Sequence, residues 1–400
     1  MIVIYISGGI DPEILNQLIK KYSLNPSGYS QQWWDFTMLK GLSDNLNVDL
    51  FCISVPPIPT FPSSNCIFLP KIEDGKITNY CVLRAINLPL VKQLQFKNTL
   101  YRKIKGIIKQ HSSEQIIILT SYIYYNTAKP AIELRKKYSN VKIATFVPDL
   151  PDFYGNKDLG RHRVLKRMFD FYKKQCISIK NEFDAYLCFS EKQMDFLNSQ
   201  KPFCVIEGVL DRDTISKVEQ IEVQKSNIML YAGGVHYKYG IKELVDAFSL
   251  LQRSDVQLHI YGSGDAVDYV KGKERVNVFY CGIATRDEIL TKEREAILLL
   301  NPRPIVEDFS ACSFPSKLME YMASGTPVLT TRLKCITKQY DDLMLYIDDV
   351  SAEGIKKSIM NFLDNYQEYC NMGIRAKEYV INNKNEIHQA TVAVDFLRSI

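Results

Sequence analysis

The stretch FPSKLMEYMASGTPVLTT, residues 314–331, has the pattern of a short helix that ends at a glycine and leads into a strand. Its one acidic residue, Glu320, lies in the expected first turn of that helix. A carboxylate there can accept hydrogen bonds from the hydroxyl groups of a ligand. The helix dipole also favours an acid at this place, by roughly 0.3–1 kcal/mol. The residue type alone therefore leaves a binding role and a purely structural role open.

Three further segments that end in glycine turns precede this stretch. They are YAGGVHYKYGIKELVDAF (231–248), HIYGSGD (259–265) and VNVFYCGI (276–283). Glycine after a strand lets the backbone approach a ligand closely, and a following helix offers free backbone N–H groups. Each turn alone is a weak signal, and GSGDAV lacks the third glycine of a dinucleotide fingerprint. Together the four segments predict a site for a nucleoside diphosphate.

These motifs resemble the nucleotide-sugar domain of retaining GT-B glycosyltransferases, specifically glycosyltransferase family 4. The family has a glycine loop before a helix ending in L-x-x-A-F, then a G-x-G turn, and the chain matches both within 233–264. Its hallmark is a pair of glutamates with seven residues between them. EYMASGTPV (320–328) matches every fixed position of the second half of that motif. The resemblance is specific over about 228–331 and only architectural over the first 205 residues.

The resemblance implies that Glu320 accepts hydrogen bonds from the ribose hydroxyls of a sugar nucleotide. It also implies that the start of its helix, around Ser316 and Lys317, faces the phosphates or the sugar. The donor-binding candidates are Glu320, Ser316, Lys317, Gly233, Gly234, Gly262, Gly264, Gly282, Phe314 and Leu318.

The chain departs from the family pattern at three positions. Cys312 stands where the first glutamate belongs, and FPSKLME resembles a variant that lacks this glutamate. The family's diphosphate-binding Arg and Lys align with Gly234 and Tyr239. We expect Lys238, one position away, or Lys317 to supply the missing positive charge.

The first half of the chain offers fewer candidates. Many family members carry a His-Asp pair after a strand of this half, and the equivalent stretch here is ATFVPDLPDFYG, with Asp149 and then Asp152. We expect Asp149 first, and Asp152 second, to contact the sugar or the acceptor, although DLPD is also an ordinary turn sequence. Gly8 and Gly9 follow the first strand and are expected on the acceptor side.

Short apolar strands alternate with amphipathic helices along the whole chain, which predicts buried parallel sheets with helical crossovers. The pattern runs twice, so we expect the GT-B fold: two doubly wound, Rossmann-like α/β domains with a cleft between them. The predicted domains are an acceptor-binding domain, 1–205, and a nucleotide-sugar-binding domain, 206–379. A last helix at about 380–400 is expected to pack back on the first domain. The polar segment 211–226 is predicted as a linker, and its DRD sequence as a chance match to a metal motif.

Composition narrows the class of protein. Ten scattered cysteines without a C-x-x-C pair argue against a zinc site or a disulfide framework. The sequence shows no signal peptide and no apolar run of about 18 residues, so we expect a cytoplasmic protein. Because the DRD sequence is taken as a chance match, we expect no catalytic metal, and we expect no cofactor. Residues 1–205 hold 27 Lys and Arg against 17 Asp and Glu. Much of this excess lies in 88–111 and 160–180, which are either solvated helix faces or a surface for anionic lipid. Nucleic acid is not expected, since no recognition motif accompanies these residues.

The sequence therefore predicts a retaining, metal-independent glycosyltransferase. Its expected donor is a nucleoside-diphosphate sugar, and its expected acceptor is a glycan or a polyprenyl-linked glycan at the inner face of the cell membrane. Capsule, exopolysaccharide or other surface-glycan synthesis would use such an enzyme. One alternative is a catalytically silent GT-B partner that stabilises an active transferase. Another is an epimerase or phosphorylase that acts on sugar nucleotides or glycans.

Overall fold

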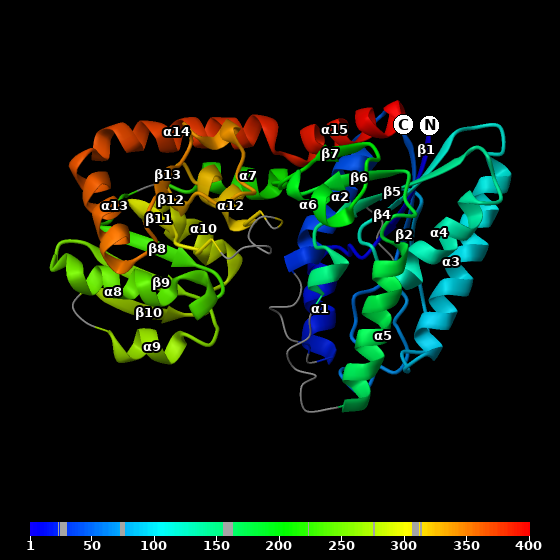
Figure 1. Ribbon diagram of the computed structural model, residues 1–400, viewed down its shortest axis with the longest axis horizontal. Helices are drawn as coiled ribbons and strands as arrows, with labels where there is room; N and C mark the ends of the chain where they lie inside the picture. Colours follow the sequence, from blue (N-terminus) through cyan, green and yellow to red (C-terminus); the bar gives the residue numbers. More distant parts are fainter. Residues whose placement is uncertain are drawn as a thin grey trace. The chain divides into compact units, whose positions relative to one another are not determined.

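The computed structural model describes residues 1–22, 24, 30–72, 77–154, 163–222, 224–274, 277–305, 312 and 314–400. The chain forms two compact units (Figure 1). The N-terminal unit comprises Met1–Val209 together with Glu386–Ile400, and the C-terminal unit comprises Leu210–Asn385. In each unit a parallel sheet carries helices on its faces.

The N-terminal unit is built on a sheet of seven parallel strands in the order β3-β2-β1-β4-β5-β6-β7. Runs of Ile, Val and Leu form its central strands, and every residue of β1 and β4 is buried. Such runs suit a sheet covered on both faces. The strands are β1 (Ile2–Ser7), β2 (Asp49–Ser54), β3 (Tyr80–Val82), β4 (Ile116–Thr120), β5 (Val141–Val147), β6 (Ala185–Cys188) and β7 (Phe203–Val205).

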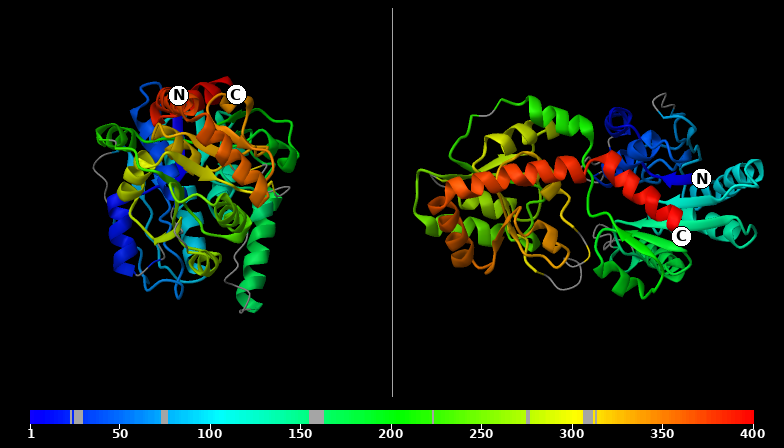
Figure 2. Two further views of the ribbon diagram at one scale, coloured as in Figure 1. Left: turned by 90° about the vertical axis from the view of Figure 1, so that its left-hand side faces the viewer. Right: turned by 90° about the horizontal axis from the view of Figure 1, so that it is seen from above.

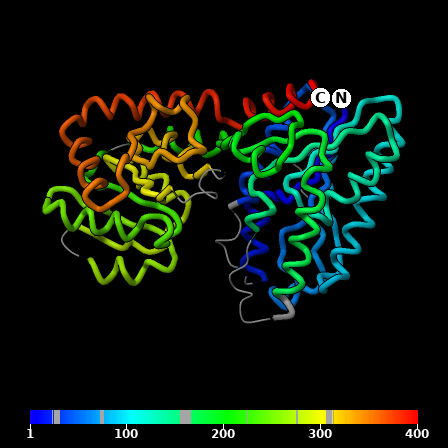
Figure 3. Tube along the Cα trace, viewed as in Figure 1, coloured from blue at the N-terminus to red at the C-terminus, as the bar shows by residue number. Residues whose placement is uncertain are grey.

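Helices cover this sheet, and the last helix of the chain is one of them. α15 packs beside α2 (Figure 2). The two helices contribute buried apolar side chains to one cluster with the sheet. Met1 and Ile400 pack against that same cluster, so the two chain ends lie close together (Figure 3). The helices are α1 (Pro12–Tyr22), α2 (Ser30–Asp44), α3 (Val91–Gln110), α4 (Tyr125–Arg135), α5 (Arg163–Ile179), α6 (Lys192–Leu197) and α15 (Glu386–Ser399), with a 3-10 turn at Pro151–Phe153.

The C-terminal unit has six parallel strands in the order β10-β9-β8-β11-β12-β13. Successive strand residues point to opposite faces. Leu298 and Leu300 therefore join the apolar cluster under α8 and α13, whereas Leu299 joins the cluster under α12 and α14. The strands are β8 (Ile228–Ala232), β9 (Gln257–Tyr261), β10 (Val278–Gly282), β11 (Leu298–Asn301), β12 (Val328–Thr331) and β13 (Leu345–Ile347). The helices are α7 (Arg212–Gln220), α8 (Ile241–Leu251), α9 (Val267–Gly272), α10 (Arg286–Glu295), α12 (Lys317–Ala323), α13 (Ala352–Asp364) and α14 (Tyr366–Asn383), with 3-10 turns at Tyr237–Tyr239 and Lys338–Tyr340.

One sequence prediction about the organisation of the chain was wrong. The segment 211–226, predicted as a linker, contains α7, because the Asp211 carboxylate caps the helix by accepting the Thr214 N–H at 2.9 Å and Ile215 and Val218 are buried. The last helix, expected at about 380–400, is α15, which begins at Glu386 and belongs to the N-terminal unit.

Each sheet has one point where the strand order reverses. It lies between β1 and β4 in the N-terminal unit and between β8 and β11 in the C-terminal unit. Ligands of doubly wound folds bind beyond the carboxyl ends of the strands at such a point. Within the described residues, no helix combines the length and the apolar character that crossing a bilayer requires.

Candidate functional site: a cationic glycine loop beside Glu320

The loop after β8 lies against the turn after β9, which in turn contacts the end of β10. Gly233 N–H donates to the Tyr261 carbonyl at 3.0 Å, and Gly262 N–H donates to the Gly282 carbonyl at 2.7 Å. A Cβ atom on Gly262, whose φ is +133°, would lie 1.8 Å from the Gly233 oxygen. A Cβ atom on Gly264 would lie 2.1 Å from a backbone oxygen of the same loop. Gly262 and Gly264 therefore let three loops pack closely at the end of the sheet.

Lys317 brings a positive charge to this loop. Its Nζ lies 4.0 Å from the centre of the Tyr231 ring, and a Cβ atom on Gly233 would approach that Nζ to 2.6 Å. The Tyr231 hydroxyl in turn donates to the Gly234 carbonyl at 2.7 Å. Lys317 is the first residue of α12. The start of this helix therefore lies at the glycine loop, although the two are far apart in sequence.

Two more cations lie around the second tyrosine of the loop. The Arg303 guanidinium is 5.5 Å, and Lys238 Nζ 4.8 Å, from the centre of the Tyr239 ring. Arg303 is buried, whereas Lys238 is exposed. The faces of aromatic rings attract cations, so Tyr239 helps to hold these two side chains at the loop. The loop can therefore offer its positive charges to an anionic ligand.

The charge of Lys317 is tuned by its surroundings. The pKa of Lys317 is lowered to about 7, chiefly by burial and also by the positive charge of Arg303, while the charge of Glu293 opposes the change. A nearby anion favours the charged form of an amine. A diphosphate bound here would therefore raise the pKa of Lys317 and draw a proton onto it.

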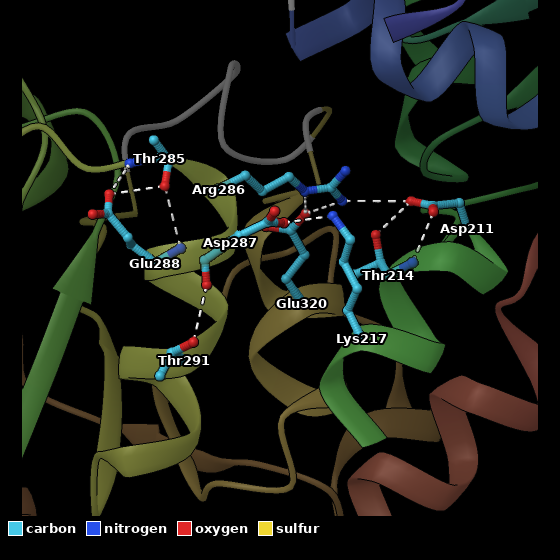
Figure 4. A network of polar contacts seen from close by, with 9 residues as sticks. All are labelled: Asp211, Thr214, Lys217, Thr285, Arg286, Asp287, Glu288, Thr291 and Glu320. Carbon is cyan, nitrogen blue, oxygen red and sulfur yellow. Dashed lines mark hydrogen bonds and ion pairs between the residues drawn. The ribbon is translucent and has the colours of Figure 1, made fainter. Parts of the chain in front are cut away.

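Glu320 is the acid at the centre of a network of polar contacts in the same unit (Figure 4). Arg286 donates to its Oε1 from Nε at 3.0 Å and from Nη2 at 2.5 Å, and Arg286 Nη2 also lies 3.6 Å from Asp211 Oδ2. Glu320 Oε2 has no hydrogen-bond partner among the described residues, and the side chain is 28% exposed. Although burial lowers the pKa of Arg286, the charges of Glu320 and Asp211 outweigh burial and raise it. One face of the Glu320 carboxylate is thus fixed and the other can accept ligand hydroxyls.

The start of α10 explains why Arg286 is held there. Thr285 caps the helix and forms a capping box with Glu288: Thr285 N–H donates to the glutamate at 2.7 Å, and Glu288 N–H donates to the threonine hydroxyl at 3.4 Å. Arg286 is therefore the first residue of a fixed helix. The ion pair of Lys217 Nζ with Asp287 Oδ1, at 2.7 Å, ties α7 to the same turn.

Glu293 lies at the far end of α10 and is buried. Its Oε2 has no hydrogen-bond partner in the described part of the chain. Burial raises the pKa of Glu293 well above its ordinary value, and the charge of Glu320 raises it further. Arg286 and Lys317 act in the opposite direction. The Glu293 carboxyl therefore interacts electrostatically both with Lys317 at the loop and with the Glu320 network.

The remaining donor candidates lie around these groups. Phe314 and Leu318 are buried in the apolar cluster under α12, where packing accounts for their side chains. Ser316 is exposed at the beginning of that helix, and Gly282, with φ +78°, ends β10. Cys312, at the place of the missing family glutamate, is buried.

The candidates of the first half of the chain lie in the N-terminal unit. Asp149 follows β5 and its Oδ2 accepts a hydrogen bond from Gln31 Nε2 at 2.5 Å. Burial, and next the charge of Asp149, raise the pKa of Tyr124. Asp152 forms an ion pair with Lys180 Nζ at 3.1 Å, which ties the Pro151–Phe153 turn to the residue after α5.

The two glycines after β1 are held by different contacts. Gly8 N–H donates to the buried Asp35 carboxylate at 2.6 Å. The Gly9 carbonyl accepts from Ser54 Oγ at 2.9 Å, and a Cβ atom on Gly9 would lie 2.9 Å from the Phe36 backbone. Gly9 therefore permits close packing against α2.

Sequence reasoning missed Arg286, Arg303 and Glu293, and it assigned Asp211 no role at the site. A local signal existed for Arg286, because the T-x-x-E pattern of TRDE (285–288) marks a helix start. Nothing in the sequence indicated that Arg303 and Lys317 would meet at one loop. Across the described ranges, no cluster of three or more His, Cys, Asp or Glu side chains could hold a metal ion.

Solved structures with the same architecture define the class of fold. The chain resembles a sucrose-phosphate synthase from Thermosynechococcus elongatus (TM-score 0.58, 15% identity), with 100% of this chain and 98% of that chain covered. A glycosyltransferase from Rickettsia africae ESF-5 gives a TM-score of 0.60 at 13% identity, with 100% and 98% covered. The Anabaena protein HepE, solved in complex with UDP, gives 0.58 at 14%, with 100% of both chains covered. The fold, two Rossmann-like parallel-sheet units, is that of GT-B glycosyltransferases.

The sequence of the C-terminal unit gives a narrower finding. Residues 211–379 match the family model described as Glycosyl transferases group 1. Among curated protein sequences, none matches the chain. The C-terminal unit thus carries a group 1 domain, and this match together with the fold supports a GT-B glycosyltransferase.

Proposed function

We propose that the protein is a retaining glycosyltransferase of family 4 that uses a nucleoside-diphosphate sugar as donor. The observation that carries the proposal is the pairing of the cations at the glycine loop with Glu320 at the switch point of one sheet. Lys317, Arg303 and Lys238 would bind the diphosphate, and the open Glu320 Oε2 would accept the ribose hydroxyls. UDP bound to the structurally similar HepE supports a nucleotide donor.

The chemistry follows from these charges. The bond from the sugar to the diphosphate breaks as the acceptor oxygen attacks from the same face, so negative charge grows on the leaving diphosphate. Fixed cations stabilise that charge in the transition state. Lys317, whose pKa rises as the anion binds, would supply one of them without a metal ion. Asp149, from the N-terminal unit, is the proposed polar contact to the sugar or acceptor.

The alternative of a catalytically silent partner rested on Gly234 and Cys312, which stand where charged family residues belong. Lys317 and Arg303 meet at the glycine loop and can replace the missing phosphate-binding charges. This placement of the cations supports the active enzyme over that alternative.

Thermal unfolding with UDP-, GDP-, dTDP- and ADP-sugars tests the donor site. A ligand at 100 times its dissociation constant stabilises the folded state by about 2.7 kcal/mol, which raises the melting temperature by several degrees. Glu320→Ala should lose this shift, whereas Glu378→Ala, an exposed glutamate on α14, should keep it. No shift with any donor at millimolar concentration would contradict the proposed function. An anomeric proton signal of the product then reports retention or inversion.

We propose further that the protein works in the cytoplasm, at the inner face of the membrane, on a glycan or polyprenyl-linked acceptor of surface-glycan synthesis. The helices α3 and α5 carry the basic excess, with no acidic residue in 91–110 and one, Asp170, in 163–179. Changing exposed Lys166 and Lys174 to Glu should release the protein from phosphatidylglycerol vesicles, since each surface cation contributes about 1 kcal/mol. Unchanged vesicle sedimentation would refute membrane contact.

A further inference from the structure

The N-terminal unit contains a cavity of about 600 Å³ that the donor site does not use. The carboxyl end of β1, with Ser7 and Gly8, forms one wall, and Ser121 and Tyr122 after β4 adjoin it. The cavity therefore lies at the switch point of the seven-stranded sheet. Its volume is within the range of about 300–1,000 Å³ of small-molecule sites.

Apolar side chains line most of the cavity and continue to its mouth. Leu90, Met168 and Phe171 all line it, and they are 65%, 42% and 63% exposed. Leu90 also has a φ of +64°, a backbone conformation that L residues adopt only at a cost. In the free protein, neither the strained backbone of Leu90 nor the exposure of its side chain to solvent stabilises the fold. These side chains suit a ligand whose apolar part leaves the cavity across them.

One lysine inside the cavity has N–H donors available for a ligand. Lys92 is 8% exposed, and its Nζ donates to the Ile58 carbonyl at 2.5 Å. The ammonium group carries three N–H donors. No carboxylate lies within ion-pair distance of it among the residues that the structure describes. Burial lowers the pKa of Lys92 to about 8, as expected for a cation that lacks an anion.

Two amide side chains of the lining also lack partners. Gln32 Oε1 and Gln93 Oε1 are buried and accept no hydrogen bond from a described residue. An unsatisfied buried acceptor is unfavourable, and hydroxyl groups of a ligand could satisfy both. The polar groups of the cavity are thus suited to bind an anion at Lys92 and hydroxyl groups at the two amides.

The surroundings of the mouth favour an anionic surface. Part of the lining comes from the start of α3 and from α5, the two basic helices. A free soluble anion would need Lys92 but not the exposed apolar side chains beside these helices. A lipid chain linked to a phosphate would contact both Lys92 and the exposed apolar side chains. The anionic membrane that holds such a lipid is also attracted to the basic faces of the two helices.

We infer that this cavity binds the phosphate and the first part of the hydrocarbon chain of a single-chain lipid phosphate that carries the acceptor sugar. The inference rests on the proposed glycosyltransferase function for the identity of the ligand as acceptor. The phosphate lies against Lys92, sugar hydroxyls meet Gln32 and Gln93, and the chain leaves over Leu90 and Phe171.

Calorimetric titration of the full chain with decyl phosphate, without any donor, tests this site independently of the donor site. We expect saturable binding of one molecule and much weaker binding of decanol or inorganic phosphate. Octyl phosphate should bind about 15-fold more weakly if both missing methylenes are buried, at about fourfold for each. Failure of the donor experiment would leave this result unaffected, so the two proposals can fail separately.

Variants identify the cavity as the place of binding. Lys92→Met should weaken decyl phosphate at least tenfold and remove its advantage over decanol. Lys103→Met, an exposed lysine on the same helix, should change neither. Phe171→Ser alters an exposed side chain, so it keeps the fold measurable if Lys92→Met is unstable. It should weaken decyl phosphate, whereas Leu46→Ser, a fully exposed leucine outside the cavity, should not.

Three results would overturn the inference. The first is equal binding of decyl phosphate by the wild type, Lys92→Met and Phe171→Ser. The second is binding of inorganic phosphate as tight as that of decyl phosphate, which would indicate a site for a free anion. The third is vesicle binding that Lys92→Met and Lys103→Met reduce equally while decyl phosphate does not bind, because the basic surface alone would then explain lipid contact.

Discussion

Lys317 allows a sharp test, because its pKa of about 7 in the free protein lies inside the range of practical assays. The diphosphate should bind the protonated form and hold the proton on Lys317. Above pH 7 the free protein has lost this proton, so binding must take one up from solvent. Affinity for a nucleotide sugar should then fall about tenfold for each pH unit, or about a hundredfold between pH 6 and pH 9.

The assay is calorimetric titration of the donor at several pH values, in two buffers of different ionisation enthalpy. The diphosphate diester of a nucleotide sugar keeps its charge over this range, so the slope belongs to the protein. Above pH 7 we expect an uptake of close to one proton for each ligand bound. Lys317→Arg should give a flat profile, because a guanidinium stays charged throughout.

Lys317→Met is the decisive control, since it removes the charge at every pH. We expect weak binding with little pH dependence. A steep decline that persists in Lys317→Met, or a flat profile in the wild type, would refute the assignment of Lys317 as the titrating phosphate ligand. The cation at the loop would then be Arg303 or Lys238.

Two further changes test the parts that position the site. Arg286→Met frees Glu320 from its ion pair. The KM for the donor should then rise about fivefold, as expected for a pair of about 1 kcal/mol, while kcat stays within about twofold. An unchanged KM would show that Glu320 needs no partner. Gly262→Ala places a Cβ atom 1.8 Å from a backbone oxygen, so the C-terminal unit should lose about 2 kcal/mol or more and melt about 4–8 °C lower. Gly272→Ala, where a Cβ atom meets nothing within 4 Å, should leave the melting temperature within a degree or two, and equal effects of the two changes would contradict the close packing of the loops.

Strand and helix patterns in the sequence were enough to predict much of the fold. The central strands of both sheets are short, mostly apolar segments rich in Ile, Val and Leu, as the alternation of strands and helices in the sequence predicted. The sequence missed β3, β7 and β13, which have three residues each and are too short to show a period. It also missed α7, because that helix depends on the Asp211 cap and on apolar residues that alternate with charged ones.

At the site, the sequence by itself determined the local parts. The glycine turns, the short helix that begins at Lys317 and the acid in its first turn all follow from neighbouring residues. Only the tertiary structure decided which charges meet, because the order of strands in a sheet, and not distance along the chain, sets which loops adjoin. That order brings Arg303 from the loop after β11 and Lys317 from α12 to the glycine loop after β8, and sets Arg286 between Asp211 and Glu320. Burial, which lowers the pKa of Lys317, likewise exists only once the chain has folded.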